Sequence, residues 1–288
     1  MKPSLVPIAA GLLAMVPFMP AHADNKVTVV QTSNKSAIAV DQTNGSNGIA
    51  SITQAGTQNK VSIAQSDVGS PRTERGSAAN SAVIKQSGFQ NGINAKPADY
   101  PLTFHGQINT SANGALNIVN ATQGGTGNDI SYGQNGFGDS LKLVQASDNN
   151  KMVISQNGPN NAGDVNQHGS SGMIQAIQNG SDNSYTATQT GGGNHLTIGQ
   201  AADHNDALAD QSGASNTLAI SQLGQLDSVS AVQGGTSNDV ELTQYGLDET
   251  ITLHQSGSAN VMSVSQATTG ASANLTQTGL TSIITIAQ

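Results

Sequence analysis

Residues 189–200 read Gln189-Thr-Gly-Gly-Gly-Asn194-His-Leu-Thr-Ile-Gly-Gln200, and residues 211–222 repeat the same pattern. Glutamine returns at every eleventh residue from Gln123 to Gln288 without a slip. A fixed period over this length is typical of a repeat architecture, which favours a repeated surface or a polymer over one catalytic cleft. The series comprises Gln123, Gln134, Gln145, Gln156, Gln167, Gln178, Gln189, Gln200, Gln211, Gln222, Gln233, Gln244, Gln255, Gln266, Gln277 and Gln288.

The repeated unit is Gln-x-Gly-x-x-Asn-x-h-x-h-x-Gln, where h is an apolar residue. Its second half alternates with period two, which predicts a β-strand with one buried face. Parity puts the asparagine, both apolar residues and the next glutamine on that buried face. The asparagines at this position are Asn128, Asn150, Asn161, Asn183, Asn194, Asn205, Asn216, Asn238 and Asn260.

Eleven residues are too few for a strand, a crossover helix and a second strand, so a short glycine-containing arc must join consecutive strands. A buried amide needs a hydrogen-bond partner, and identical amides stacked at roughly 4.8 Å can bond to the copies above and below. This works best if each residue lies over the one 22 positions later. We therefore predict an all-β fold, a β-solenoid of two strands per 22-residue rung. Its two facing parallel sheets would enclose a narrow apolar core, with Gln and Asn ladders at the margins.

The unit is less regular before residue 123. We predict a signal peptide at 1–23, irregular repeats at 24–122 with insertions near 66–79 and 98–115, and regular repeats at 123–288. Counting the predicted strands gives about eleven rungs, or roughly 50 Å of solenoid. Pro97 occupies a glutamine position and cannot donate to a ladder, so the weakest seam is expected near residues 97–115.

The N-terminus has the features of a secretory signal peptide: Lys2, a mostly apolar stretch from Leu5 to Phe18, and Ala21-His22-Ala23 before the expected mature start at Asp24. A membrane anchor is less favoured because the stretch is short and broken by prolines, and no later segment is apolar enough to span a bilayer. The chain has no cysteine, so hydrogen bonds between rungs must supply the stability after secretion. A disordered, prion-like chain would share the composition, but strict periodicity disfavours it.

The net charge of −8 argues against nucleic acid as a partner. No Lys or Arg follows Lys151, while ten acidic residues do. Solubility and protection against premature strand pairing explain this asymmetry, and we favour that interpretation. Electrostatic steering of one end of the molecule toward the other is the alternative.

No catalytic motif is recognisable, and we predict no enzyme activity, no cofactor and no metal site. Asp203, His204 and Asp206 lie close in sequence, but a solvated arc explains them better than a metal cluster. The glycine pairs precede strands rather than helices, so phosphate binding is not indicated. Carboxylates replace asparagine in three units, where they are expected to perturb the ladder; these are Asp139, Asp227 and Glu249.

The unit resembles the curlin repeat of curli subunits, and residues 189–200 and 211–222 match it closely. The resemblance covers nearly all of the chain after residue 23. Members of this family are secreted bacterial proteins that polymerise into extracellular amyloid fibres. The resemblance implies a two-strand-per-rung solenoid, export through a dedicated outer-membrane pore, nucleated assembly, and a role in adhesion and biofilm. The chain departs from typical curlin subunits in its doubled rung number and its proline-containing insertions.

We therefore expect a structural subunit whose main partner is a second copy of itself, with a nucleator subunit as a possible further partner. The last strand, Ser282-Ile-Ile-Thr-Ile-Ala-Gln288, has no proline or charged side chain, so Ile284 and Ile286 are the predicted polymerisation edge. The alternative is a monomeric secreted β-solenoid adhesin or surface-binding protein. A flat threonine array would favour that alternative, but the outward positions are mixed in type.

Overall fold

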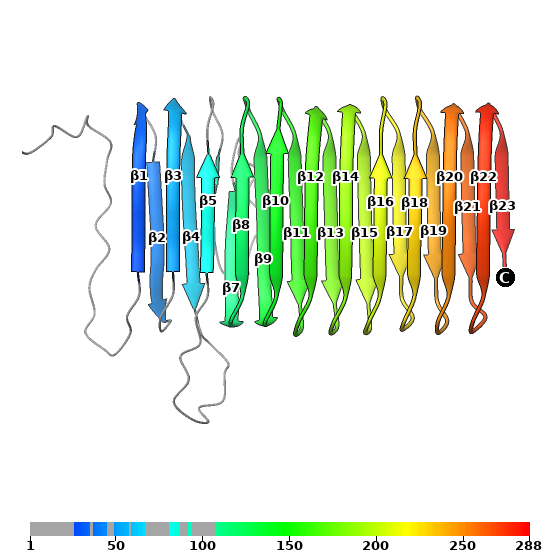
Figure 1. Ribbon diagram of the computed structural model, residues 1–288, viewed down its shortest axis with the longest axis horizontal. Helices are drawn as coiled ribbons and strands as arrows, with labels where there is room; N and C mark the ends of the chain where they lie inside the picture. Colours follow the sequence, from blue (N-terminus) through cyan, green and yellow to red (C-terminus); the bar gives the residue numbers. More distant parts are fainter. Residues whose placement is uncertain are drawn as a thin grey trace, which may run out of the picture.

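The computed structural model describes residues 26–34, 37–44, 49–57, 59–66, 81–86, 92–93 and 108–288. The predicted signal peptide, Pro97 and residues 67–79 of the first predicted insertion lie outside these ranges. All regular elements in the described ranges are β-strands. They stack along one axis into a rod, with the N-terminal strands at one end and the C-terminal strands at the other (Figure 1).

The strands form two parallel sheets. The first sheet has eleven strands in the order β1 (Lys26–Asn34), β3 (Ile49–Thr57), β5 (Ser81–Gln86), β8 (Ile118–Gln123), β10 (Ser140–Ala146), β12 (Ala162–Ser170), β14 (Ser184–Gly192), β16 (Asp206–Gln211), β18 (Ser228–Gln233), β20 (Thr250–Ser258) and β22 (Ser272–Leu280). The second has twelve, namely β2 (Ala37–Asn44), β4 (Lys60–Ser66), β6 (Gly92–Ile93), β7 (Ile108–Ala115), β9 (Asp129–Phe137), β11 (Lys151–Asn157), β13 (Met173–Asn179), β15 (His195–Ala201), β17 (Thr217–Gln222), β19 (Asp239–Gln244), β21 (Val261–Gln266) and β23 (Ile283–Ala287).

Apart from β6 and β7, which both lie in the second sheet, consecutive strands alternate between the sheets, so the chain completes one layer of the solenoid with two strands and two arcs (Figure 1). From β8 onward each residue pairs with the one 22 positions later, as Gln145 does with Gln167 and Gln167 with Gln189. The predicted all-β solenoid with two parallel sheets is confirmed. The rung count differs slightly from the prediction of about eleven, and the twelfth strand of the second sheet adds no layer of its own, because β6 and β7 both pair with β4 and β9.

The core lies between the two sheets and consists of the inward apolar side chains of each layer. Strand β17 has the burial pattern expected from period two, since Leu218 and Ile220 are 0% and 2% exposed while Thr217 faces solvent. The glycine that recurs two residues after twelve of the fifteen glutamines from Gln123 to Gln277 has a steric cause. A Cβ on Gly213, whose φ is 98°, would lie 2.0 Å from the carbonyl oxygen of Gly235 in the next layer. Glycine, which has no Cβ, allows these two arcs to stack this closely.

One layer of the second sheet is assembled from two separate segments. Gly92 of β6 pairs with Lys60 and Asp129, and Ile108 of β7 pairs with the next residues along β4 and β9. Residues 108–115 therefore form a strand, although the prediction counted them in the insertion near 98–115. The open hydrogen-bonding edges of β4 and β9 give this stretch partners on both sides, which its broken glutamine register did not reveal.

Candidate functional site: amide columns and end layers

The sixteen predicted glutamines form two columns, one in each sheet, where a column is a set of residues 22 positions apart. From Gln123 to Gln266, each glutamine Nε2 donates to Oε1 of the glutamine one layer later, at N···O distances of 2.7–3.2 Å. The glutamines up to Gln277 are at most 3% exposed, whereas Gln288 in the last layer is exposed. Amide ladders of this kind satisfy buried polar groups that would otherwise destabilise the fold.

The glutamines also tie the two sheets together. Gln200 Nε2 donates a second hydrogen bond, of 2.7 Å, to the carbonyl oxygen of Ser184, where β14 of the opposite sheet begins. Gln222 makes the equivalent bond of 2.9 Å to Asp206. Both amide protons are therefore used. Because each ladder bond runs from an earlier layer to a later one, the two ends of the rod are chemically different.

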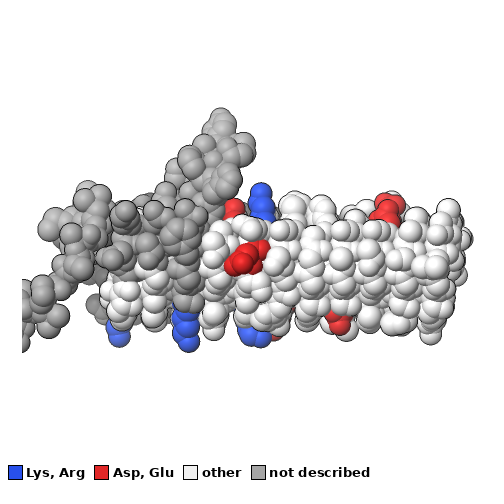
Figure 2. Space-filling view, turned by 90° about the horizontal axis from the view of Figure 1, so that it is seen from above, with Lys and Arg blue, Asp and Glu red and all other residues white. Residues whose placement is uncertain are grey.

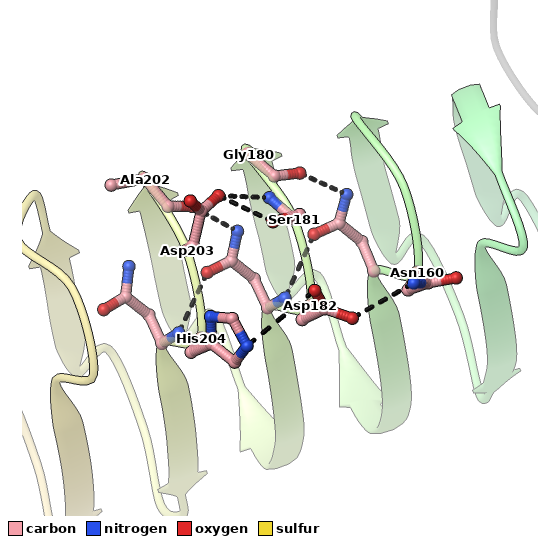
Figure 3. A network of polar contacts seen from close by, with 10 residues as sticks. Asn160, Gly180, Ser181, Asp182, Ala202, Asp203 and His204 are labelled. Atoms are coloured by element: carbon pink, nitrogen blue, oxygen red, sulfur yellow. Dashed lines mark hydrogen bonds and ion pairs between the residues drawn. The ribbon is translucent and has the colours of Figure 1, made fainter.

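The predicted asparagines also form two columns, but their side chains bond mainly to the backbone. The amide N–H of Asn205 donates to Oδ1 of Asn183 at 2.9 Å, and Asn183 Nδ2 donates to the carbonyl oxygen of Ala202 at 2.8 Å. The carbonyl oxygen of Gly180 accepts an equivalent bond from the preceding layer (Figure 3). Each asparagine thus fixes its own arc to the arc of the next layer. The expected direct bond between side-chain amides joins Asn260 to Asn238, at 3.1 Å.

The polar residues of the arcs around residues 180 and 203 bond to one another (Figure 3). Asp203 accepts hydrogen bonds of 2.8 Å from both the backbone N–H and the hydroxyl of Ser181, and these bonds lower the pKa of the Asp203 carboxyl. His204 Nε2 lies 3.9 Å from Asp182 Oδ2, and Asn160 donates to the same Asp182 side chain. Within the described ranges, no group of three or more His, Cys, Asp or Glu side chains could hold a metal ion.

Asp139, Asp227 and Glu249 point inward and are at most 1% exposed. Oδ1 of Asp139 accepts the backbone N–H of Asn161 at 3.0 Å, as an asparagine in this position would. Oδ1 of Asp227 accepts the N–H of Glu249 at 3.1 Å. Burial raises the pKa of Asp139 to about 6, against an opposing effect of the hydrogen bonds from Asn161, and burial also raises the pKa of Asp227. One oxygen of each of the three carboxyls has no hydrogen-bond partner.

At each end of the rod, the last described layer has a neighbouring described layer on one side only. Ile284 and Ile286, the predicted polymerisation edge, follow Met262 and Val264 in register. They are only partly buried, whereas Met262 and Val264 are 1% exposed. At the opposite end, β1 exposes 46% of Val27 and 38% of Val29.

Sequence reasoning predicts an open edge at both end layers, but it names residues only for the C-terminal one. The signal for the second edge was available, because Val27, Val29 and Gln31 already follow the inward alternation of the unit.

The outward surface has few charges. On the face in Figure 2, basic side chains lie over the N-terminal part of the rod, and only acidic ones are visible over the C-terminal part. Lys142 and Asp164 form an ion pair of 2.8 Å across neighbouring layers, but both side chains are well exposed, so it contributes little to stability. No helix in the described ranges is long and apolar enough to cross a membrane.

Comparison with known proteins agrees with this geometry. Residues 193–224, which contain β15, β16 and β17, match the family model of the curlin associated repeat. No curated protein matches the chain. The repeat and the solenoid together indicate a curli-like structural protein. The predicted resemblance is therefore confirmed: the chain carries the curlin associated repeat, at residues 193–224, within a rod built from the same eleven-residue unit.

Proposed function

We propose that the chain is a structural subunit of an extracellular curli-like fibre, in which the last layer of one copy pairs with the first layer of the next. The main support for this proposal is that each sheet ends in strands with an open hydrogen-bonding edge. Within the described residues, β1 and β2 have a neighbour on one side only, and so do β22 and β23. Such edges carry unpaired backbone N–H and C=O groups, which favour β-augmentation by a second chain.

The two ends also match in register. Aligning Gln277 with Gln31 sets β22 against β1 over all nine residues of both strands. The same shift sets the first residue of β23 against the first residue of β2. A second copy could therefore continue both sheets without a bulge, as though it were the next turn of the same solenoid.

The apolar side chains of the end layers support the same alignment. It brings Val27 and Val29 over Ala273 and Leu275, and it brings Ile38 and Val40 over Ile284 and Ile286. All but Ala273 are exposed or only partly buried in the single chain. Covering these side chains would add the hydrophobic stabilisation that the interior layers already have. Neither β22 nor β23 contains a charged residue that would oppose the contact.

The curlin repeat extends this proposal to the setting of the fibre. We infer secretion, export through a dedicated outer-membrane pore, a separate nucleator subunit as a second partner, and a contribution to cell adhesion and biofilm matrix. Display of fibres on cells that carry such a pore, followed by electron microscopy, tests these parts separately from assembly in solution.

Assembly itself is tested by thioflavin T fluorescence on freshly desalted residues 24–288 at several concentrations, with electron microscopy of the end points. The expected result is a lag followed by concentration-dependent growth of fibres, with the lag removed by preformed seeds. A flat trace from a stable β-rich monomer, also in the presence of seeds, would contradict the proposal and favour a monomeric surface-binding protein.

A further inference from the structure

Asp139 and Asp227 place the oxygen Oδ2 at a position where the asparagine layers have the side-chain nitrogen Nδ2, a hydrogen-bond donor. In the layer of Asn260, the side-chain nitrogen Nδ2 lies 3.0 Å from the ideal Cβ position of Gly257, which is the point where a Cβ would stand if Gly257 had one. The same nitrogen donates to the carbonyl oxygen of Gly279 at 3.0 Å. In the aspartate layer of Asp227, the oxygen Oδ2 lies 2.7 Å from the equivalent point on Gly224. An acceptor therefore stands where the asparagine layers have an N–H.

A carbonyl oxygen of the next layer lies close to this position in both aspartate layers. The ideal Cβ position of Gly136 lies 2.9 Å from Asp139 Oδ2 and 2.0 Å from the carbonyl oxygen of Gly158. The corresponding point on Gly224 lies 1.7 Å from the carbonyl oxygen of Gly246. An ionised carboxylate would bring a negative oxygen toward another acceptor, and for Asp227 the backbone N–H of Gly224 offsets this only in part. A protonated carboxyl matches the asparagine amide in shape and in hydrogen bonding.

We propose that Asp139 and Asp227 are proton-binding residues of the solenoid. Each carboxyl takes up a proton when its layer closes, that is, when the layer folds onto its neighbours, and the protonated carboxyl then donates a hydrogen bond to a backbone carbonyl. The inference concerns the closing of layers within one chain, so it stands whether or not copies polymerise. Two independent layers carry the same arrangement, and in both the unpartnered oxygen is fully enclosed.

Among the described residues, the neighbours of Asp139 in its column and in the adjacent arcs carry no charge that would hold it ionised. Asn117 and Asn161 lie before and after it in its column, and Gln156 of the opposite sheet bonds to the adjacent backbone. The arcs at 113–117 and 157–161 have no ionisable side chain. Burial is the main influence, and it raises the pKa of Asp139 to about 6.

The surroundings of Asp227 are acidic. Burial is the largest influence on the pKa of Asp227 and raises it, and the negative charges of Glu249 and Asp248 in the arc of the next layer act in the same direction. Hydrogen bonds from the backbone N–H groups of Glu249 and Gly224 oppose this rise. Asp203 and His204 lie in the arc of the preceding layer, and the Asp203 side chain is engaged with Ser181. No Lys or Arg follows Lys151 in the sequence, so no basic side chain in that region can neutralise the pair.

The direction of the pH effect follows from these shifts. An aspartate whose pKa is higher in the closed layer than in the open chain binds more protons when closed. Its layer is therefore most stable below the ordinary pKa of about 4, and it loses stability as the pH rises toward 6. For Asp139, a shift of about two pKa units corresponds to roughly a hundredfold change in the closing equilibrium. Mildly acidic medium favours closed layers, and neutral medium opposes them.

The test compares residues 24–288 with the double variant Asp139→Asn and Asp227→Asn, which supplies the amide donor at every pH. Circular dichroism gives the urea midpoint from pH 4 to pH 8. We expect the variant to match the wild-type chain near pH 4 and to exceed it increasingly up to about pH 6. The control, Asp210→Asn with Asp239→Asn, removes two exposed carboxylates and should keep the wild-type pH dependence.

A second readout detects the proton directly. Infrared difference spectra between pH 5 and pH 8 should contain the carbonyl band of a protonated carboxyl in the folded wild-type chain and in the control, and this band should be reduced in the double variant. A urea midpoint that falls equally with pH in wild type and double variant, or a protonated-carboxyl band that survives both substitutions in full, would overturn the proposal.

Discussion

A Cβ on Gly163 would lie 2.6 Å from both Cζ and Oη of Tyr185, which follows it by one layer in the same column. The same Cβ would lie 2.8 Å from Cδ2 of Leu141, one layer earlier. Gly163 stands at an inward position that the repeated unit normally fills with an apolar side chain. The missing side chain makes room for the tyrosine ring, so the thin core keeps its packing by exchanging volume between layers rather than within one layer.

Tyr185→Phe should stabilise the solenoid by about 1 kcal/mol. The tyrosine is 2% exposed, its hydroxyl has no hydrogen-bond partner, and burial raises the pKa of that hydroxyl. Removing a buried, unsatisfied polar atom while keeping the ring removes a desolvation cost. Urea unfolding followed by circular dichroism measures the change. Tyr245→Phe is the control, because Tyr245 is 56% exposed and should change little. A clear loss of stability in Tyr185→Phe would mean that the hydroxyl has a partner in solution.

Gly213→Ala should strongly destabilise its layer, by about 2–4 kcal/mol. Its φ is 98°, and the new Cβ would meet the carbonyl oxygen of Gly235 at 2.0 Å, so both the backbone and the next layer must move. Gly199→Ala is the matched control, because its nearest contact is an oxygen at 3.9 Å and its φ is not positive. Hydrogen exchange of the neighbouring backbone amides reports the loss layer by layer, which suits a repeat protein that need not unfold in one step. Equal protection in the two variants would refute the steric explanation of the recurring glycine.

Gln200→Ala should destabilise the layers around it by about 2–4 kcal/mol, since it removes the hydrogen bond to Ser184 and one of the two ladder bonds of each buried neighbour, Gln178 and Gln222. Gln175 lies on β13, faces outward and has no such role, so Gln175→Ala should cost less than about 0.5 kcal/mol. Urea midpoints of the two variants decide the point. If both substitutions cost the same, the ladder contributes no more than an ordinary surface glutamine.

The sequence was sufficient to predict the two sheets because their determinants are local and repeated. Every unit contains the full alternation of apolar and polar residues, so the inward direction of Leu218 and Ile220 follows from their positions in the unit. The partners of the asparagines were harder to predict, because Asn183 bonds to a carbonyl whose position depends on the arc conformation of the next layer. The donor-requiring position at Asp139 has the same origin. Whether this position requires a donor depends on where the neighbouring carbonyl oxygens lie, and the spacing of residues in the repeat does not reveal that.

The exceptions to the repeat were also beyond sequence reasoning. Gly163 stands at a position where the unit normally has an apolar side chain, and the exception is explained by the space that the ring of Tyr185 needs. Strand β7 lies in a stretch with no regular glutamine spacing, and it is a strand because β4 and β9 offer it backbone partners. Both cases depend on residues that are distant in sequence, which local patterns do not encode.

Replacing both Ile284 and Ile286 with lysine should slow fibre elongation at least tenfold without unfolding the rod. Both side chains point toward the core position that a second copy would cover, and a lysine there would bury a charge in each new contact. The control is Ile283→Lys in the same strand, since Ile283 points outward and is 75% exposed. Seeded thioflavin T growth gives the elongation rate, and circular dichroism verifies that the variants fold. If the double variant elongates on wild-type seeds as fast as Ile283→Lys does, the C-terminal layer is not a growing end, and polymerisation would have to proceed from another surface.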